Sequence, residues 1–243
     1  MGYGIMKICI IDGYHKKERF RISSFNIEMG YQCFKRVLKE YNKNLNFDIY
    51  FSWESLPENL SMYNGIVFTG SDFHPVGLIE KEKKLFLKIL KKDIPIYGSC
   101  WGCQLAALAT GGKVDELPNR EQPVAENIKI IKGNHYIYKG KPKIFDGFAS
   151  HAAYISQAGE CNILATNEYT GIQALSVGSF VGFQYHCEYR EQEAAGFLQI
   201  RKPEGMSYNI KDYKFDKTIE DKQLRQTEIK NWLENIDIGL TLK

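Results

Sequence analysis

The sequence predicts an α/β protein built on one mostly parallel, twisted β-sheet with helices on both faces. Two observations support this prediction. Short apolar runs alternate with longer segments of helical spacing up to about residue 109, which is typical of βαβ units with right-handed crossovers. From about residue 124, short strands at close spacing indicate hairpins added to the sheet. Since its 243 residues contain no internal repeat and no low-complexity linker, we expect a single domain over 1–243.

The elements of the first half follow from hydrophobic spacing. Apolar runs predict four strands, at 7–12, 47–51, 65–68 and 94–97. Apolar residues at helical spacing predict helices over 26–41 and 78–92, and a segment rich in Ala and Leu predicts a further helix over 105–109. Residues 15–24 carry many charges and are expected to form a polar loop.

The second half is expected to contain shorter elements. Four strands are predicted there, at 128–131, 163–166, 172–177 and 180–185. A helix can form over 188–198, and residues 201–213, which contain Pro203 and Gly205, are expected to be irregular. A terminal helix is predicted over about 217–237, since its apolar positions follow helical spacing: Leu224, Ile229, Trp232, Leu233 and Ile236.

The composition narrows the classes of partner. A net charge of +3 is near neutral and does not favour nucleic acid or a membrane surface as a partner. The lysine runs at 81–84 and 91–92 are better explained by solvated helix faces. No apolar stretch approaches the ~20 residues of a membrane span. The cysteines are scattered rather than arranged as a disulfide framework, and no signal peptide is recognisable, so a cytoplasmic location is the simplest expectation.

The segment 94–104 carries the strongest chemical signal. The predicted strand 94–97 breaks at Gly98, Cys100 follows, and Gly102 precedes the predicted helix. A nucleophile on such a strand–turn–helix junction is lifted above the carboxyl edge of the sheet. The N-terminus of the helix also favours a thiolate. Cys100 is therefore predicted to perform cysteine chemistry.

A thiol that attacks an amide needs a base, an acid that orients the base, and N–H donors for the oxyanion. The best candidates for the first two are His186, which closes an apolar strand, and Glu188, which lies two residues further on. Because the strand ends there, both side chains are expected at the edge of the sheet.

These motifs carry a family resemblance. Gly98-Ser99-Cys100-Trp101-Gly102-Cys103-Gln104 fits the pattern G-x-C-x-G-x-Q, and Phe183-Gln184-Tyr185-His186-Cys187-Glu188 is similar to v-Q-F-H-P-E. In this order they resemble the class I glutamine amidotransferases of the Cys-His-Glu type. The strand and turn from Gly65 to Ser71 resemble the segment that this family uses for its oxyanion hole, and Ser150-His151 resembles a pair in the glutaminase domain of GMP synthetase. The matching stretches cover about residues 7–199.

The resemblance implies a flavodoxin-like sheet and a thioester mechanism. Cys100 would attack the γ-carboxamide of glutamine, His186 would act as base and then as acid, and Glu188 would orient His186. Backbone N–H groups of three residues would form the oxyanion hole: Trp101, Gly70 and Ser71. Substrate would be held by Gln104 and by the segment of Ser150, His151 and Ala152, which alternatively docks a partner domain.

No metal or cofactor is implied by the resemblance. Ammonia would pass to a separate synthetase chain, since no P-loop pattern is present that would bind ATP. The expected partners are therefore a small-molecule amide and such a synthetase.

Three segments depart from the family pattern. The turn reads Thr69-Gly70-Ser71-Asp72 where the GMP synthetase type resembles Ser-Gly-Gly-Pro. Cys187 stands where Pro is usual, and Ala152-Ala153 stands where Gly and Asp are usual. The changes at 69–72 and at Cys187 affect the backbone of the turns that carry the expected oxyanion hole and triad. The change at Ala152-Ala153 affects which substrate is expected.

Simpler structural roles compete with each candidate. Cys100 could be a buried structural thiol. Cys103 is expected in the core, although a C-x-x-C redox pair is an alternative. A metal site at 186–188 is disfavoured, because alternate strand residues face opposite sides. His74 is expected to line the mouth of the site without an assigned role.

Three functions remain open from the sequence. The first is a glutaminase that supplies ammonia to a synthetase. The second is a stand-alone γ-glutamyl hydrolase that uses the same triad on a γ-glutamyl conjugate. The third is a non-catalytic binding relative, which the presence of Cys100, His186 and Glu188 argues against.

Overall fold

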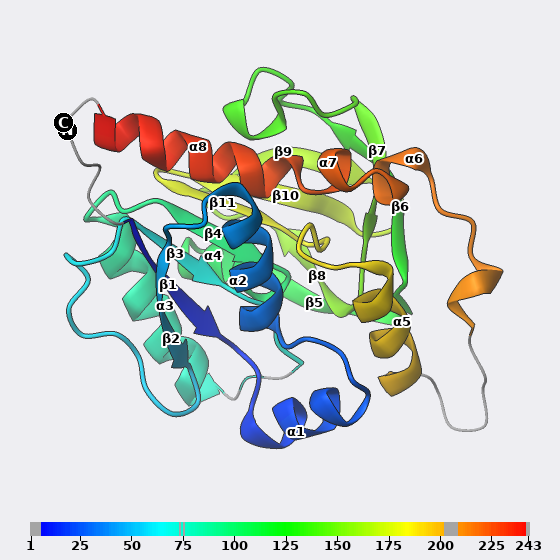
Figure 1. The fold of residues 1–243 in the computed structure, drawn as a ribbon, viewed down its shortest axis with the longest axis horizontal. Coiled ribbons are helices and arrows are strands. Elements are labelled where there is room, and N and C mark those ends of the chain that lie inside the picture. Colours follow the sequence, from blue (N-terminus) through cyan, green and yellow to red (C-terminus); the bar gives the residue numbers. More distant parts are fainter. Residues whose placement is uncertain (1–5, 73, 75, 202–208, 242–243) are drawn as a thin grey trace.

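The computed structural model describes residues 6–72, 74, 76–201 and 209–241, and these form one mixed sheet with helices on both faces (Figure 1). Five parallel strands make up one half of the sheet. In spatial order they are β2 (Asn46–Phe51), β1 (Lys7–Asp12), β3 (Gly65–Phe68), β4 (Ile96–Ser99) and β11 (Phe180–Phe183). The predicted α/β class is confirmed.

Antiparallel strands extend the sheet beyond β11. Next to it lie, in order, β10 (Gly171–Val177), β9 (Asn162–Asn167), β6 (Val124–Ile130) and β7 (Ile144–Phe148). A side branch contains β8 (His151–Gln157), which pairs with β10 and with β5 (Lys113–Glu121). The sequence did not predict β5, β7 or β8. In β5 charged residues and a proline interrupt the apolar alternation, so only pairing with β8 identifies it as a strand.

Four helices cover the parallel half of the sheet. Helices α2 (Gly30–Tyr41) and α8 (Thr227–Thr241) pack on one face, and α3 (Val76–Leu90) and α4 (Trp101–Ala109) pack on the other (Figure 1). Side chains of β1 alternate between these layers: Ile8 and Ile10 belong to the α2–α8 core, and Cys9 and Ile11 to the α3–α4 core. Apolar contact on both sides explains why the parallel strands read as continuous apolar runs.

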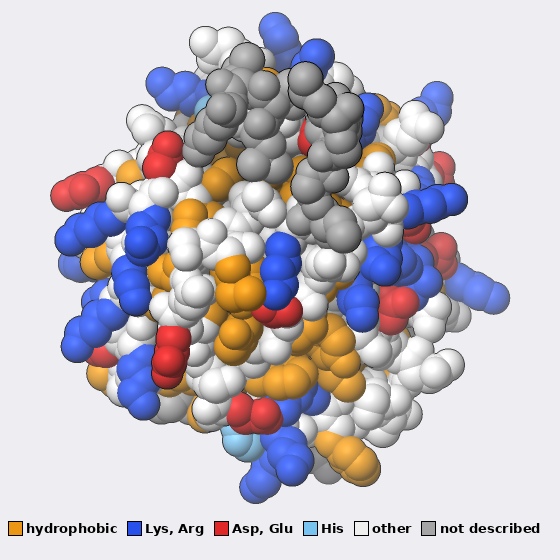
Figure 2. All heavy atoms as spheres, turned by 60° about the vertical axis from the view of Figure 1, so that its left-hand side comes forward, with side chains coloured by type: hydrophobic (Ala, Val, Ile, Leu, Met, Phe, Trp, Pro, Cys, Tyr) orange, Lys and Arg blue, Asp and Glu red, His pale blue; other side chains and the backbone are white. Residues whose placement is uncertain are grey.

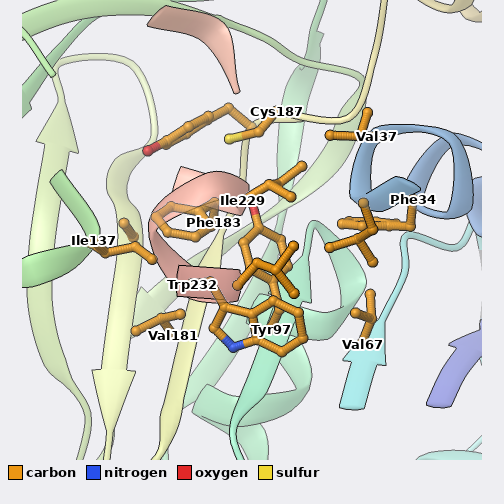
Figure 3. Packing of buried hydrophobic residues seen from close by; sticks show 14 of the residues in the cluster. Phe34, Val37, Val67, Tyr97, Ile137, Val181, Phe183, Cys187, Ile229 and Trp232 are labelled. Carbon is orange, nitrogen blue, oxygen red and sulfur yellow. The ribbon is translucent and has the colours of Figure 1, made fainter. Parts of the chain in front are cut away.

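The α2–α8 core is built around aromatic side chains. Figure 3 shows Trp232 of α8 over Tyr97 of β4, with Phe183 and Phe34 nearby. The rings of Tyr97 and Trp232 meet edge to face with centroids 5.7 Å apart. The C-terminal helix therefore packs directly on the strand that leads to Cys100.

Capping decides several boundaries that hydrophobic spacing placed elsewhere. Residues 15–24, expected to be a loop, include helix α1 (Lys16–Ser24), because His15 and Glu18 form a capping box at its start. The helix expected over 188–198 is α5 (Glu191–Ile200), where the Arg190 backbone N–H donates to Glu193. The predicted terminal helix is three helices, α6 (Lys217–Glu220), α7 (Lys222–Arg225) and α8. Asp216 caps the start of α6, and Asp221 ends α6 and caps the start of α7.

Other boundaries move by a few residues. The helices predicted over 26–41, 78–92 and 105–109 correspond to α2, α3 and α4, and α4 begins four residues earlier than expected. The strand predicted over 94–97 runs over Ile96–Ser99, and the strand predicted over 180–185 ends at Phe183. Two 3₁₀ turns complete the described chain, η1 (Tyr136–Tyr138) and η2 (Ile210–Asp212). Of the expected irregular segment 201–213, residues 202–208 lie outside the described residues.

The surface carries mixed charge. Figure 2 brings the left-hand side of Figure 1 forward, and Lys and Arg side chains there lie among Asp and Glu side chains. On α3, Lys81, Lys84 and Lys88 are exposed, as expected for a solvated helix face. No helix in the described part of the chain combines the length and the apolar character that a bilayer crossing requires.

Candidate active site

Cys100 occupies the turn between β4 and α4 with strained backbone angles, φ 50° and ψ −99°. Its N–H donates to the Phe183 carbonyl of β11 at 2.7 Å, which holds the turn against the neighbouring strand. The residue is 5% exposed. The glycines around it permit close backbone packing, since a Cβ on Gly102 would lie 2.6 Å from the Phe68 carbonyl oxygen. A Cβ on Gly98 would lie 2.7 Å from the backbone of Gly102.

The structure brings His186 and Glu188 together next to this turn. The His186 N–H donates to the Phe148 carbonyl at 2.7 Å, which fixes the chain just beyond β11. Its Nδ1 lies 2.7 Å from Glu188 Oε1, and both side chains are buried. The Ser99 hydroxyl donates to the same carboxylate oxygen at 2.8 Å. The residue directly before Cys100 thus helps to position Glu188, a contact that the sequence analysis missed.

The electrostatic environment of His186 favours the imidazolium. Burial lowers the pKa of His186, but the Glu188 carboxylate and the Cys100 thiol outweigh it and raise that pKa to about 9. The Nε2 atom of His186 is buried, and no described residue forms a hydrogen bond with it. The Cys100 thiol, which influences the pKa of His186, is the group that can exchange a proton with it.

Aromatic rings fix the plane of the imidazole. Tyr189 stacks on His186 with ring centroids 3.9 Å apart and an interplanar angle of 3°. Phe197 of α5 stacks on Tyr189 in turn, with centroids 5.2 Å apart. Tyr189 follows Glu188 directly in the sequence, so its place beside the motif could have drawn attention to it.

The turn after β3 lies against Cys100. A Cβ on Gly70 would be 3.5 Å from His186 Cε1 and 3.6 Å from Cys100 Cβ. Gly13 supports this turn from behind, since a Cβ there would lie 2.8 Å from the Gly70 carbonyl oxygen. The Ser71 hydroxyl donates to the Gly13 carbonyl at 3.0 Å. Gly70, one of the predicted oxyanion donors, therefore lies against Cys100, and Ser71 follows it in the same turn.

Trp101 is the first residue of α4, where a backbone N–H has no partner within the helix. Its ring stacks on His74, with centroids 4.3 Å apart, and its indole N–H donates to Glu82 at 3.3 Å. His74 was expected at the mouth of the site, but it is buried, with Nε2 3.2 Å from Glu82. The acid on α3 and the indole hold this imidazole inside the protein.

The four predicted substrate residues have different surroundings. Gln104 is buried and donates through Nε2 to the Ala153 carbonyl at 3.0 Å. His151 is also buried, 2.7 Å from Glu121. Ser150 accepts hydrogen bonds from Arg201, whereas the Ala152 side chain is exposed on β8. Gln104 and His151 thus contact buried protein groups, and Ser150 contacts the side chain of Arg201.

The remaining cysteines are structural in their surroundings. Cys103 belongs to the α3–α4 core, and burial raises its pKa well above the usual value. Cys187 belongs to the α2–α8 core, to which Phe183 and Trp232 also belong (Figure 3). Burial likewise raises the pKa of Cys187. All six cysteines of the chain are free and buried.

One group of metal-ligating residues occurs in the described part of the chain: Glu28, Cys33 and Glu193, with candidate ligand atoms within 4.8 Å of one another. Both carboxylates already pair with guanidinium groups, Glu28 with Arg36 at 2.7 Å and Glu193 with Arg190 at 2.7 Å. Burial raises the pKa of the Cys33 thiol, which opposes its use as a ligand. The group is better described as an ion-pair network.

Comparison with known proteins places this geometry in a family. The family model described as glutamine amidotransferase class-I matches residues 29–199. A γ-glutamyl-L-1-hydroxyisopropylamide hydrolase of a Pseudomonas species is 29% identical over 216 residues, covering 80% of this chain and 71% of that enzyme. GMP synthase of Lactobacillus gasseri is 30% identical over 180 residues, which cover 69% of this chain but 33% of that protein. The chain thus spans about a third of that GMP synthase.

Solved structures agree on the fold. A glutamine amidotransferase of Thermotoga maritima matches with a TM-score of 0.72 at 20% identity, covering 96% of this chain and 99% of that one. One from Methylobacillus flagellatus matches with a TM-score of 0.68 at 16% identity, covering 98% and 94%. The motif resemblance and the family match cover the same part of the sequence. The chain belongs to the class I glutamine amidotransferase family and is an enzyme of that class.

Proposed function

We propose that this enzyme hydrolyses the γ-carboxamide of glutamine through a γ-glutamyl thioester on Cys100 and releases glutamate and ammonia. The observation that carries the proposal is the position of Cys100. A thiol in a strained turn, with φ 50°, lies at the start of a helix and beside a buried imidazole–carboxylate pair. This arrangement supplies a nucleophile, a base and an orienting acid.

Each side chain has a defined task in the proposed reaction. In the resting site Nε2 of His186 already holds the proton taken from the Cys100 thiol, and the Cys100 sulfur attacks the γ-carbonyl carbon. The imidazolium then gives this proton to the nitrogen, ammonia leaves, and the thioester remains. Water, deprotonated by His186, cleaves the thioester to glutamate and regenerates the thiol. Glu188, at 2.7 Å from Nδ1, holds the ring in the orientation that presents Nε2 to the sulfur.

The oxyanion of each tetrahedral intermediate is proposed to bind backbone N–H groups. The Trp101 N–H at the start of α4 is one donor, and the turn of Gly70 and Ser71 supplies the other. Support comes from the contact between this turn and Cys100, since a Cβ on Gly70 would lie 3.6 Å from Cys100 Cβ. Gln104 is proposed to act indirectly, because its amide already donates to Ala153.

A second candidate function is hydrolysis of a γ-glutamyl conjugate rather than of glutamine. The Pseudomonas relative favours it, since its alignment covers 71% of that enzyme, whereas the alignment with Lactobacillus gasseri GMP synthase covers 33% of that protein. The same atoms would react, with an amine leaving in place of ammonia.

A separate synthetase chain that uses the ammonia is the proposed partner under the first function. Support comes from a relative whose name describes it as one subunit of a glutamine-hydrolysing GMP synthase. This protein, from Methanococcus maripaludis, is 33% identical over 113 residues, covering 45% of this chain and 58% of that one. Under the second function, no such partner is required.

The test is glutamate release from L-glutamine and from a panel of γ-glutamyl alkylamides by the purified chain. We expect release that is abolished in Cys100→Ala and retained in Cys103→Ala, a matched variant of a buried cysteine in the same helix. A preference for glutamine by kcat/KM supports the glutaminase, and a preference for an alkylamide supports the hydrolase. Equal release by the wild type and Cys100→Ala contradicts both.

A further inference from the structure

A charged cluster beside Cys100 was not anticipated from the sequence. Arg201, the residue after α5, has a side chain that is only 6% exposed. Its Nη1 atom donates to the carbonyl and to the hydroxyl oxygen of Ser150, each at 2.5 Å. Its Nη2 atom forms an ion pair with Asp72. The guanidinium therefore connects two loops that are far apart in the sequence.

Those two loops border the catalytic groups. Asp72 lies two residues after Gly70, the residue that touches Cys100 and His186. Ser150 lies two residues after Phe148, whose carbonyl accepts the His186 N–H at 2.7 Å. Arg201 consequently bridges the two loops that border the triad.

A second guanidinium reaches the same point. Arg120 of β5 donates to the Ser150 carbonyl at 3.2 Å. Burial lowers the pKa of Arg120, as does the positive charge of Arg201, whereas Asp72 and Cys100 raise it. Arg120 and Arg201 thus donate to the same carbonyl oxygen. Among the described residues, one carboxylate, that of Asp72, pairs with Arg201. The two guanidinium groups therefore carry more positive charge than this carboxylate balances, and the Arg201 side chain is largely removed from water.

Arg201 still has hydrogen-bonding capacity. Its Nε atom is buried and has no partner among the described residues. The plane of the guanidinium lies over the Phe197 ring, with Cζ 4.5 Å from the centroid, so the orientation of its N–H groups is fixed. A fixed guanidinium with an unused donor is suited to a carboxylate ligand.

The remaining partner of Arg201 has the opposite charge and more contact with solvent. The Asp72 side chain is 27% exposed, so one of its oxygens can accept from a ligand while the other contacts Arg201. A cation site and an anion site thus lie next to each other, on the two loops that border the triad.

We propose that Arg201, supported by Arg120, binds the α-carboxylate of the γ-glutamyl substrate and that Asp72 binds its α-ammonium group. The proposal rests on the proposed function, since it places the γ-carbonyl at Cys100. In glutamine the α-carbon carries both charged groups and is separated from the γ-carbon by a short chain, which fits adjacent charge sites beside the nucleophile. These residues thus select γ-glutamyl compounds with a free amino-acid end over simple amides.

The experiment measures binding without turnover, by calorimetry on the Cys100→Ala protein. The probes are L-glutamate, γ-aminobutyrate, which lacks the α-carboxylate, and glutarate, which lacks the ammonium group. We expect Arg201→Gln to weaken L-glutamate binding roughly tenfold to hundredfold, the effect of losing a charge-assisted hydrogen bond, and to leave γ-aminobutyrate binding unchanged. Asp72→Asn should weaken L-glutamate and leave glutarate unchanged.

Arg19→Gln is the matched control, since Arg19 is also largely buried and paired with an acid, Glu54, outside this cluster. We expect it to bind all three probes as the parent does. Equal weakening of every probe by Arg201→Gln, with intact folding by circular dichroism, would mean that Arg201 only clamps the loops and would overturn the proposal. Absence of L-glutamate binding to the parent protein would overturn it as well.

Failure of the proposed function gives a different result. If the wild type releases no glutamate from any amide but Cys100→Ala binds L-glutamate in an Arg201-dependent manner, the recognition site stands and the glutaminase does not. If release depends on Cys100 but Arg201→Gln lowers kcat/KM equally for L-glutamine and for 4-aminobutanamide, which lacks the α-carboxylate, the glutaminase stands and the recognition site does not.

Discussion

The titration of His186 follows from its burial and from two neighbours. Burial lowers its pKa, whereas Glu188 at 2.7 Å and the Cys100 thiol raise it, with a result of about 9. In the unfolded chain an imidazole titrates near its ordinary value of about 6.5. The folded protein therefore holds a proton on His186 over a range in which the unfolded chain has lost it.

This difference predicts a pH-dependent stability. A pKa that is raised on folding stabilises the folded state fully below about pH 6.5, and this contribution is lost as the pH rises through about 9. We expect the free energy of unfolding of the wild type, relative to His186→Gln, to decrease over that interval. Urea titrations at several pH values measure it, and a difference that does not vary with pH would contradict the assignment.

Ser99 is expected to act through Glu188 rather than on the substrate. Its hydroxyl donates to Glu188 Oε1 at 2.8 Å inside the protein. We predict that Ser99→Ala lowers kcat for glutamate release more than it changes KM, and lowers the free energy of unfolding by about 1–3 kcal/mol. Steady-state kinetics and urea unfolding measure both effects.

Ser179→Ala is the control for this variant, because Ser179 donates to the Ile94 carbonyl at 3.0 Å, away from the triad at the start of the adjacent strands. It should leave kcat unchanged. An equal kcat in the two variants would show that the Ser99 hydroxyl does not position Glu188.

At the scale of elements, the approach of α4 to the sheet depends on residues without side chains. The Gly102 N–H donates to the Thr69 carbonyl at 3.2 Å, and a Cβ on Gly102 would lie 2.6 Å from the Phe68 carbonyl oxygen. Helix α4 can therefore begin directly over the end of β3, and this position brings Cys100 next to Gly70. The two glycines of the cysteine motif thus have a packing role as well as a role in the turn.

Gly102→Ala is predicted to destabilise the protein by about 1–3 kcal/mol, because backbone atoms must shift to admit the methyl group. Gly77→Ala provides the control, since Gly77 lies in α3 and has no atom within 4 Å of the added Cβ. That variant should be neutral or slightly stabilising, as alanine favours a helix over glycine. Chemical unfolding compares the two, and equal stability of both variants would contradict the packing argument.

For the whole molecule, the C-terminal helix completes the core that packs against β4, the strand that leads to Cys100. Trp232 of α8 is fully buried and packs on Tyr97 of β4 (Figure 3). It also covers the start of β3, where a Cβ on Gly65 would lie 3.0 Å from its ring. Residues near the end of the chain therefore support strands formed near its beginning.

Trp232→Ala should remove about 3–5 kcal/mol from the free energy of unfolding, the usual cost of such a cavity. Ile238→Ala, on the same helix but 59% exposed, should change it by less than about 0.5 kcal/mol. Guanidinium unfolding monitored by circular dichroism measures both. If Trp232→Ala were as stable as Ile238→Ala, α8 would not be part of the cooperative core.

The sequence by itself determined the α/β class, the five strands of the parallel half, the motifs around Cys100 and His186 and the family. These features depend on patterns within a few residues: apolar periodicity, glycines around a cysteine, and a histidine two residues before a glutamate. Helix α1 was expected to be a loop, and the start of α5 was expected three residues too early. Capping side chains, not hydrophobic spacing, decide where these two helices form. The charged strand β5 was missed because only its partner β8 defines it.

Only the tertiary structure decided which distant residues meet. Ser99 reaches Glu188 across 89 positions, Arg201 reaches Asp72 across 129, and Tyr189 stacks on His186 only because the chain turns after β11. Such contacts depend on how helices and loops pack on the sheet, which no local pattern encodes. For that reason the proposed nucleophile and its proposed base could be picked out from the sequence, whereas the groups that contact them, and the charges beside them, could not.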